Sequence, residues 1–231
     1  MHGVLFEERW EGTDGLVTNE HAFWNPDASG ARRIDAWQVT SGSLFRRDGM
    51  AWTGVPDDRS PGTSSATGTN SATFRLTTER ADFGNVVMSF DLVHAGFVTT
   101  GSTPAVGWDG VHVLLRYQSE ESLYAVTINR RDGTIAIKKK VPDGPSNGGT
   151  YYTLATGSRP FRPGAVQRIR VSVHTNDDGT VTLTLFGSAG RPALIAIDAG
   201  AGGPPITAPG RVGIRGDNSE FTLDDLLVSE G

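Results

Sequence analysis

The stretch WDGVHVLLRYQSEESLYAVTINRRDGTIAIKKK, residues 108–140, decides the fold class. Apolar and polar residues alternate in three runs, at 110–118, 122–131 and 134–141, and this alternation predicts β-strands with one buried face. Asp132-Gly133 separates the second run from the third, and this dipeptide favours a tight antiparallel turn. The segment therefore predicts three consecutive antiparallel strands.

Similar runs continue along the rest of the chain. Thirty glycines and twelve prolines separate short stretches rich in Val, Ile, Thr, Phe and Tyr, and Asp178-Gly179 marks a second tight turn. No window shows the apolar spacing of a long amphipathic helix. Further strands are expected near residues 4–10, 36–46, 71–78, 84–94, 166–175, 179–186, 193–198, 210–216 and 220–228.

So many strands do not fit comfortably into one open sheet, but two sheets packed face to face solve the burial problem. We therefore expect an all-β fold, a two-sheet antiparallel β-sandwich of the jelly-roll type, with residues 1–231 forming one domain. Three irregular stretches are expected to be loops: 19–33, 55–70 and 141–152. Long loops of this kind are often functional, although sequence drift is the alternative.

Composition excludes several classes of protein. The 231 residues carry a net charge of −5, which argues against broad attraction to nucleic acid or anionic lipid. The chain has no cysteine, so disulfides, thiolate metal sites and cysteine nucleophiles are excluded. The N-terminal MHGVLFEERW does not have the pattern of a signal peptide, and no apolar run is long enough to span a membrane. If the protein acts outside a cell, either a signal peptide has been removed or the protein leaves the cell by another route, such as assembly into a virion.

One face of the three central strands is polar and cationic. Alternate side chains of a strand share a face, so Tyr117 and Tyr124 belong to the apolar, core-facing set. The opposite set comprises His112, Arg116, Gln118, Asn129 and Lys138. Guanidinium and amide groups match the carboxylates and vicinal hydroxyls of sugars, which favours glycan binding on this face. The alternative is an ordinary exterior face on which Arg116 and Lys138 pair with nearby acidic residues.

Aromatic residues in or beside the loops also favour glycan binding, because exposed rings stack on sugar rings. The candidates are Trp24, Trp108, Tyr151 and Tyr152.

Four segments carry a resemblance to a known family: LFEERWEG (5–12), WQVTSGSLFRRDGMAWTGVPD (37–57), residues 108–140, and GRVGIRGDNSEFTLDDLLV (210–228). Through these four segments, which span nearly the whole chain, the sequence resembles LamG-like jelly-roll domains of the concanavalin A-like lectin/glucanase superfamily. It looks closest to domains of secreted actinobacterial polysaccharide-active proteins and of minor tail proteins of phages that infect such hosts. The resemblance implies an extracellular or virion-associated protein with Trp37 in the core.

The resemblance also implies a structural Ca²⁺ that joins an acidic residue of the first strand to an aspartate of the last. The matching positions are Glu8 and Asp224, with a backbone carbonyl near Ser41-Gly42. The alternative is that Glu7-Glu8 and Asp224-Asp225 are surface charges or pair with Arg9 and Arg215.

The superfamily contains binding proteins, glycosidases and lyases, so the residues must decide the chemistry. The E-x-D-x-E pattern of its retaining glucanases is absent, which disfavours that mechanism. A polysaccharide lyase would need a base, charge-neutralising groups and an acid, and the candidates are His112, Arg116, Gln118 and Tyr124. However, alternation places Tyr124 on the core face, and the lyase strings R-x-E-L-R and Q-I-H are missing.

Three functions follow. The first is a carbohydrate-binding or cell-surface adhesion domain that recognises an extracellular polysaccharide. The second is a polysaccharide lyase or glycoside hydrolase that acts on an acidic polysaccharide. The third is a structural component of a virion or a secreted assembly.

Overall fold

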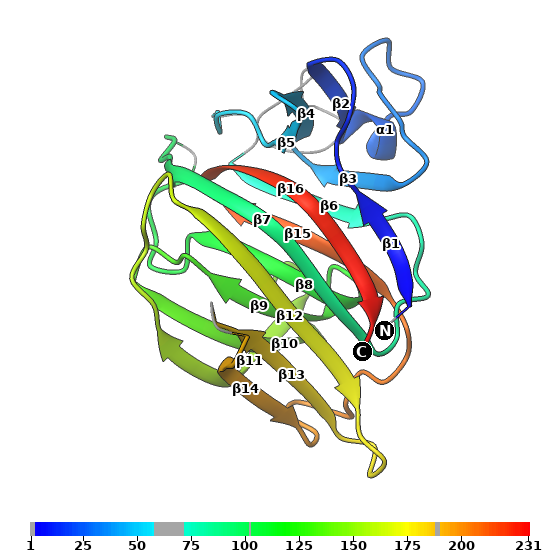
Figure 1. The fold of residues 1–231 in the computed structure, drawn as a ribbon, viewed down its shortest axis with the longest axis vertical. Coiled ribbons are helices and arrows are strands. Elements are labelled where there is room, and N and C mark those ends of the chain that lie inside the picture. The colour runs from blue at the N-terminus through cyan, green and yellow to red at the C-terminus, as the bar shows by residue number, and fades with distance from the viewer. Residues whose placement is uncertain (1–2, 58–71, 102, 188–189) are drawn as a thin grey trace.

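The computed structural model describes residues 3–57, 72–101, 103–187 and 190–231, and these residues form two antiparallel sheets packed face to face (Figure 1). One sheet contains β3 (Trp37–Ser41), β6 (Thr73–Thr78), β8 (Gly110–Ser119), β9 (Ser122–Ile128), β10 (Thr134–Ser146), β11 (Gly149–Ser158) and β15 (Arg211–Asp217). Its seven described strands follow the order β11-β10-β9-β8-β15-β6-β3. The predicted all-β sandwich is confirmed.

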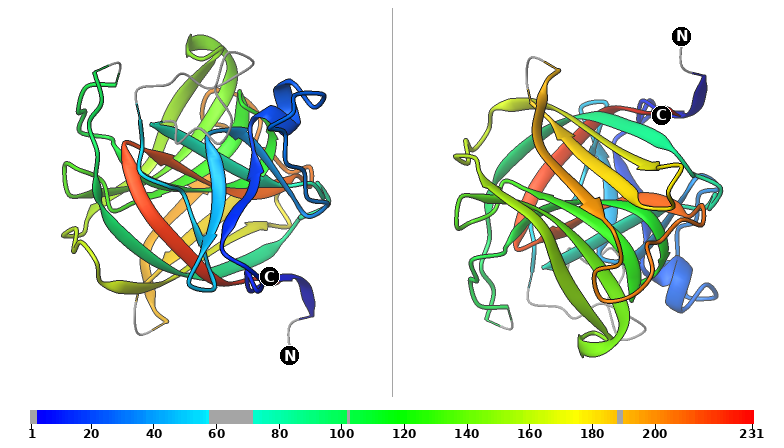
Figure 2. Two further views of the ribbon diagram at one scale, coloured as in Figure 1. Left: turned by 90° about the horizontal axis from the view of Figure 1, so that it is seen from above. Right: turned by 90° about the horizontal axis from the view of Figure 1, so that it is seen from below.

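The second sheet has nine strands within the described residues. They are β1 (Val4–Glu8), β2 (Gly15–Asn19), β4 (Ser43–Arg47), β5 (Met50–Trp52), β7 (Val86–Phe97), β12 (Val166–Thr175), β13 (Val181–Phe186), β14 (Pro192–Asp198) and β16 (Ser219–Glu230). The order is β14-β13-β12-β7-β16-β5-β4-β2, and β1 also pairs with β16. Because Val4 lies opposite Ser229, the first strand β1 lies beside the end of the last strand β16 (Figure 1; Figure 2).

The core lies between the sheets and follows the predicted alternation at most positions. Val111 and Val113 of β8 and Val126 of β9 point inward and are fully buried. Phe90 of β7 belongs to the same buried cluster from the opposite sheet. Trp37 is buried and stacks on Trp10 at a ring-centroid distance of 5.4 Å, so its predicted core position is confirmed.

Both predicted Asp-Gly hairpins are present. Gly133 and Gly179 have φ angles of +74° and +80°, which a residue without a Cβ adopts at no steric cost. They join β9 to β10 and β12 to β13. Within the described residues the one helix is the single turn α1 (His21–Trp24), and none is long and apolar enough to cross a membrane.

Some strands differ from the prediction. The run 36–46 is not one strand, because Gly42 at φ +81° breaks it into β3 and β4, which belong to different sheets. The predicted loop 141–152 instead contains the end of β10 and the start of β11. β11 is an edge strand with little burial on either face, so its sequence lacks the alternation that reveals a strand. The short strands β2 and β5 were also missed. Most of the predicted loop 55–70 lies outside the described residues.

Candidate functional site

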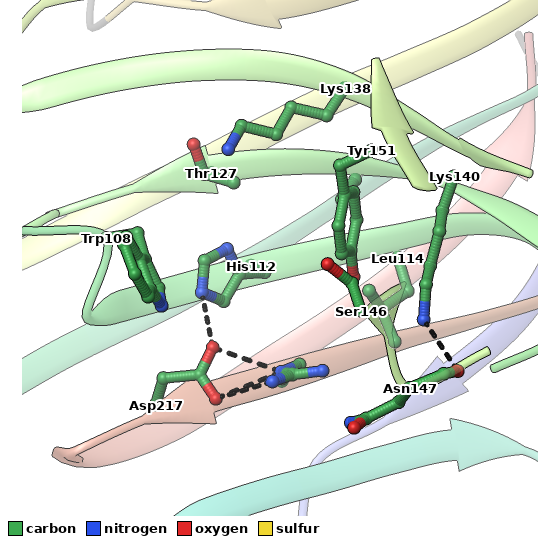
Figure 3. A pocket seen from close by; sticks show the side chains of 12 residues that line it. Trp108, His112, Leu114, Thr127, Lys138, Lys140, Ser146, Asn147, Tyr151 and Asp217 are labelled. Carbon is green, nitrogen blue, oxygen red and sulfur yellow. Dashed lines mark hydrogen bonds and ion pairs between the residues drawn. The ribbon is translucent and has the colours of Figure 1, made fainter. Parts of the chain in front are cut away.

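A cavity of about 340 Å³ lies on the face of the seven-stranded sheet that points away from the core (Figure 3). Alternate residues of β8, β9 and β10 form its floor, and the end of β15 and the β10–β11 hairpin complete it. Its lining residues are Trp108, His112, Leu114, Ala125, Thr127, Lys138, Lys140, Ser146, Asn147, Tyr151, Arg215 and Asp217. The cavity thus combines an aromatic ring, an apolar floor and several charged groups.

Three polar side chains contact one another in this cavity. Asp217 accepts hydrogen bonds from Arg215, at 2.8 Å from Nη2 and 3.1 Å from Nε, and its Oδ2 lies 3.0 Å from His112 Nε2. The strand register explains the contact, since Arg215 and Asp217 are two residues apart on one face and His112 lies directly opposite Arg215. We call these three residues the polar triad.

Charge distribution in the polar triad follows from burial and pairing. Burial alone would raise the pKa of Asp217, but Arg215 and His112 more than offset it, and the pKa lies well below its usual range. Burial lowers the pKa of His112, and Asp217 offsets only part of this. At neutral pH the triad therefore contains a carboxylate, a guanidinium and a neutral imidazole.

The tautomer of His112 follows from the same contact. Nε2 lies 3.0 Å from the carboxylate oxygen, and this contact favours the tautomer that carries the proton on Nε2 and leaves the lone pair on Nδ1. Figure 3 shows Nδ1 on the side of the ring nearer Thr127 and Lys138, and it has no hydrogen-bond partner within the described residues. The cavity thus presents an oriented hydrogen-bond acceptor.

Two lysines of β10 line the first cavity, on either side of Tyr151. Their Nζ atoms are 5.8 Å (Lys138) and 5.3 Å (Lys140) from the centre of the Tyr151 ring. Lys140 donates a hydrogen bond to the Glu120 carbonyl at 2.6 Å. Lys138 makes no hydrogen bond or ion pair with any residue that the structure describes.

A second cavity, of about 190 Å³, adjoins the first. Arg215 and Asn147 line both, and Trp24 lies in the second, where its Nε1 donates to the Thr40 carbonyl at 2.7 Å. We call the two cavities together the groove. Its two exposed tryptophans, Trp108 in the first cavity and Trp24 in the second, are 58% and 44% exposed.

Several solved structures have a fold similar to that of this chain. No family model and no curated protein matches the sequence. Among solved structures, the chain is similar to a protein of unknown function with a galectin-like fold from Bacillus subtilis (TM-score 0.57, 12% identity, 100% of this chain and 98% of that one). The carbohydrate-binding module CBM66 from Bacillus subtilis is also similar (TM-score 0.54, 10% identity, 86% and 98%).

A putative β-glucanase from Mycobacterium abscessus is a third similar structure (TM-score 0.53, 9% identity, 98% of this chain and 100% of that one). The chain folds as a jelly-roll β-sandwich similar to the galectin-like fold. At these identities the likeness establishes the fold and leaves the function to the site.

The jelly roll brings five of the predicted binding residues together. His112, Lys138, Trp108 and Tyr151 line the first cavity, and Trp24 lines the second. Arg215 and Asp217 were not predicted as binding residues, because their place beside His112 depends on the pairing of β15 with β8, between residues about a hundred positions apart. Lys140 of β10 was also omitted, although alternation places it on the same face of the strand as Lys138.

The prediction that Arg116 lies on the open face beside His112 is wrong. Leu115 and Arg116 together lie opposite Val212 of β15, so β8 contains a bulge, and Arg116 has a φ of 46°. The guanidinium is 1% exposed and donates to the Ile206 carbonyl and Asn85 Oδ1, at 2.7 and 2.8 Å. The same bulge moves Tyr117 out of the predicted core set into a separate apolar cluster with Leu114 under Tyr151.

Three further predicted residues lie away from the groove. Gln118 donates to the Pro209 carbonyl at 2.8 Å, beyond the bulge. Asn129 is buried at the end of the β9–β10 hairpin, with φ 49°. Tyr152 lies on the opposite face of β11 from Tyr151, and its ring packs so closely on Gly202 that a Cβ there would come within 2.2 Å of it. These placements correct the predicted binding set.

The set predicted for a lyase is not assembled. Tyr124 points into the core, where its hydroxyl donates to Asp198 at 2.6 Å and accepts from the backbone N–H of Ile206 at 2.9 Å. Arg116 also lies on the core side, whereas His112 faces the groove. The acid and the base are thus on opposite faces of the sheet.

The residues predicted to bind calcium do not fit a shared cation. The two carboxylate oxygens of Glu8 accept hydrogen bonds from Trp10 N at 3.0 Å and from Trp37 Nε1 at 3.1 Å. Asp224 accepts one from Asp225 N at 2.8 Å. No group of three or more acidic or histidine residues in the described part of the chain is arranged to hold a metal ion. The calcium site remains a prediction.

Proposed function

We propose that the chain is a carbohydrate-binding domain that holds an extracellular or cell-surface polysaccharide in the groove. The observation that carries the proposal is the exposed ring of Trp108 in the same cavity as the polar triad. Sugars present an apolar C–H face and a rim of hydroxyl groups, so a site needs both an aromatic surface and oriented polar groups.

The polar triad is oriented before any ligand arrives. Asp217 fixes Arg215 and His112, so that little side-chain entropy is lost when they bind a hydroxyl group. His112 Nδ1 would accept a hydrogen bond from a hydroxyl, and the Tyr151 hydroxyl, which makes no hydrogen bond to a described residue, would donate one or accept one. The second cavity and Trp24 would extend the site to further sugar residues of the same chain.

We propose that the protein acts outside the cell or as part of a virion. The resemblance to LamG-like domains supports a role in a secreted protein or a phage tail, and the carbohydrate-binding module among the similar structures agrees with glycan binding. Immunogold labelling of the producing cells and of any virions they release would test this part, and staining confined to the cytoplasm would contradict it.

A glycan array followed by calorimetry tests the binding itself, and Tyr151 and Tyr152 provide a matched pair on opposite faces of β11. We expect Trp108→Ala and Tyr151→Ala to weaken binding of the best glycan at least about fivefold, because stacking on one aromatic ring contributes about 1 kcal/mol or more. Tyr152→Ala should leave the affinity within about twofold of the parent.

Two outcomes would contradict the proposal: no glycan binds, or Tyr152→Ala weakens binding as much as Trp108→Ala does. Absorbance of unsaturated product in the same samples separates a binding protein from a lyase. Sustained turnover that His112→Ala abolishes would show that the groove is catalytic.

A further inference from the structure

The geometry points to an acidic sugar as the ligand, with the Lys138 ammonium binding its carboxylate or sulfate group in the first cavity. This inference rests on the proposed function and names the class of glycan. It depends on three observations: the charge of the cavity, the pairing of each charged group, and the position of Lys138 relative to the polar triad.

The first cavity is cationic on a chain that is acidic as a whole. Three cationic side chains line it, Lys138, Lys140 and Arg215, against the single carboxylate of Asp217. The whole chain carries a net charge of −5. A positive cavity on a negative molecule selects anions locally and does not attract polyanions to the rest of the surface.

Hydrogen bonds or ion pairs engage two of these cations, and among the described residues none engages Lys138. Arg215 is bound by Asp217, and Lys140 by the Glu120 carbonyl. Asp132, whose charge acts on Lys138 from the β9–β10 turn, is itself held by Arg130, whose Nε lies 3.0 Å from Asp132 Oδ1. Lys138 is only partly exposed and has no ion-pair partner within the described residues. A partly desolvated ammonium without a counter-ion gains more from an incoming anion than an exposed one does.

Position supports the same assignment. Figure 3 shows the Lys138 ammonium extended over the floor toward Thr127, on the Nδ1 side of His112 and on the same side of the cavity as the Trp108 ring. A sugar stacked on Trp108 would thus meet a cation and a hydrogen-bond acceptor together. An acidic group beside a ring hydroxyl presents the complementary pair, an anion and a donor.

Matched glycan pairs test the inference by calorimetry. Polygalacturonate and its methyl ester differ in the carboxylate charge, and κ-carrageenan and agarose differ mainly in sulfate. We expect the charged member of at least one pair to bind about tenfold or more tightly than its neutral partner, with an affinity that falls as NaCl is raised. The pair that shows the preference distinguishes a carboxylate from a sulfate ligand.

Variants of Lys138 assign that preference to one side chain. Lys138→Met, which keeps the length of the side chain, should reduce the preference for the charged member to about twofold or less, and Lys138→Arg should retain most of it. Arg170→Gln removes a cation from β12 of the other sheet, away from the groove, and should change nothing.

Equal binding of charged and neutral members, or an unchanged preference in Lys138→Met, would overturn the acidic-sugar inference while the carbohydrate-binding proposal stands. Binding of a neutral array glycan with no binding of either charged polymer would also overturn it. If no glycan of either kind bound, both would be wrong.

Discussion

At the scale of single residues, His94 of β7 shows how the core constrains a titratable group. It is fully buried, its ring centroid lies 4.4 Å from that of Phe161 and 4.9 Å from that of Phe97, and both ring nitrogens are buried without a hydrogen-bond partner among the described residues. Burial lowers the pKa of His94 to about 4, and a backbone contact at Gly96 offsets only part of this. The imidazole therefore acts as a neutral aromatic ring.

Stability should depend on pH through His94. Between its ordinary pKa of 6.5 and the folded value of about 4, the unfolded chain binds a proton here that the folded chain does not. The free energy of unfolding should therefore fall as the pH falls through this range, by up to about 3 kcal/mol from this residue, with no further contribution below pH 4. Urea unfolding at pH 7, 5.5 and 4 measures it.

Variants separate this effect from that of the carboxylates, which also titrate in acid. His94→Leu should flatten the difference between pH 7 and pH 4, whereas His174→Gln, at an exposed position of β12, should retain it. An equally steep fall in His94→Leu and in the parent would show that the pH dependence arises elsewhere.

At the scale of one element, β8 shows how far alternation predicts a strand. Its position, its first six residues and their faces agree with the sequence pattern, and His112 and Leu114 face the groove as expected. The bulge at Leu115 and Arg116 reverses the pattern, since one extra residue moves every later side chain to the other face. The bulge arises from pairing with β15, a partner about a hundred residues away, so nothing in the sequence of β8 indicated it.

Arg116 therefore stabilises the fold and does not bind the ligand. Arg116→Met should lower the free energy of unfolding by about 2–4 kcal/mol, because it removes charge-assisted hydrogen bonds and leaves the partly buried carbonyls of Gly84 and Ile206 without this donor. Glycan affinity of the folded variant should remain within about twofold of the parent.

Chemical denaturation and calorimetry on the same preparation measure both quantities for Arg116→Met. A large loss of affinity with unchanged stability would return this residue to the binding site and refute its assigned role.

At the scale of the whole molecule, the sequence predicted the β-sandwich but not the edge strand β11 or the full set of residues that line the groove. The alternating central strands and both Asp-Gly turns predicted the layers, because burial on one face leaves a period of two in the sequence. The edge strand β11 carries no such signal, and thus Tyr151 and Tyr152 could not be assigned to opposite faces. Likewise, Arg215 and Asp217 join His112 through long-range pairing, which no local pattern encodes.

The two sheets are also joined by a buried ion pair. Lys139 of β10 and Asp198 of β14 belong to different sheets, are fully buried, and lie 2.9 Å apart from Nζ to Oδ2. Lys139 also donates to the Gly203 and Pro204 carbonyls, each at 2.7 Å. Burial alone would raise the pKa of Asp198, but hydrogen bonds from Tyr124, Lys139 and two backbone N–H groups lower it. The pair ties the segment after β14 to the opposite sheet.

A double-mutant cycle on this pair gives the strongest test of how the sheets are held together. Lys139→Met should lower the free energy of unfolding by about 3–5 kcal/mol, because it leaves the Asp198 carboxylate buried without its cation. With Asp198→Asn added, the isosteric neutral side chain removes that charge, so the double variant should lose at least about 2 kcal/mol less than the sum of the two single variants. Guanidinium unfolding of the four proteins measures the coupling, and additive losses would show that the two groups do not stabilise each other.

Because the groove lies on the other face of β10, folded Lys139→Met should still bind the glycan that the parent binds, which separates loss of sheet packing from loss of the site.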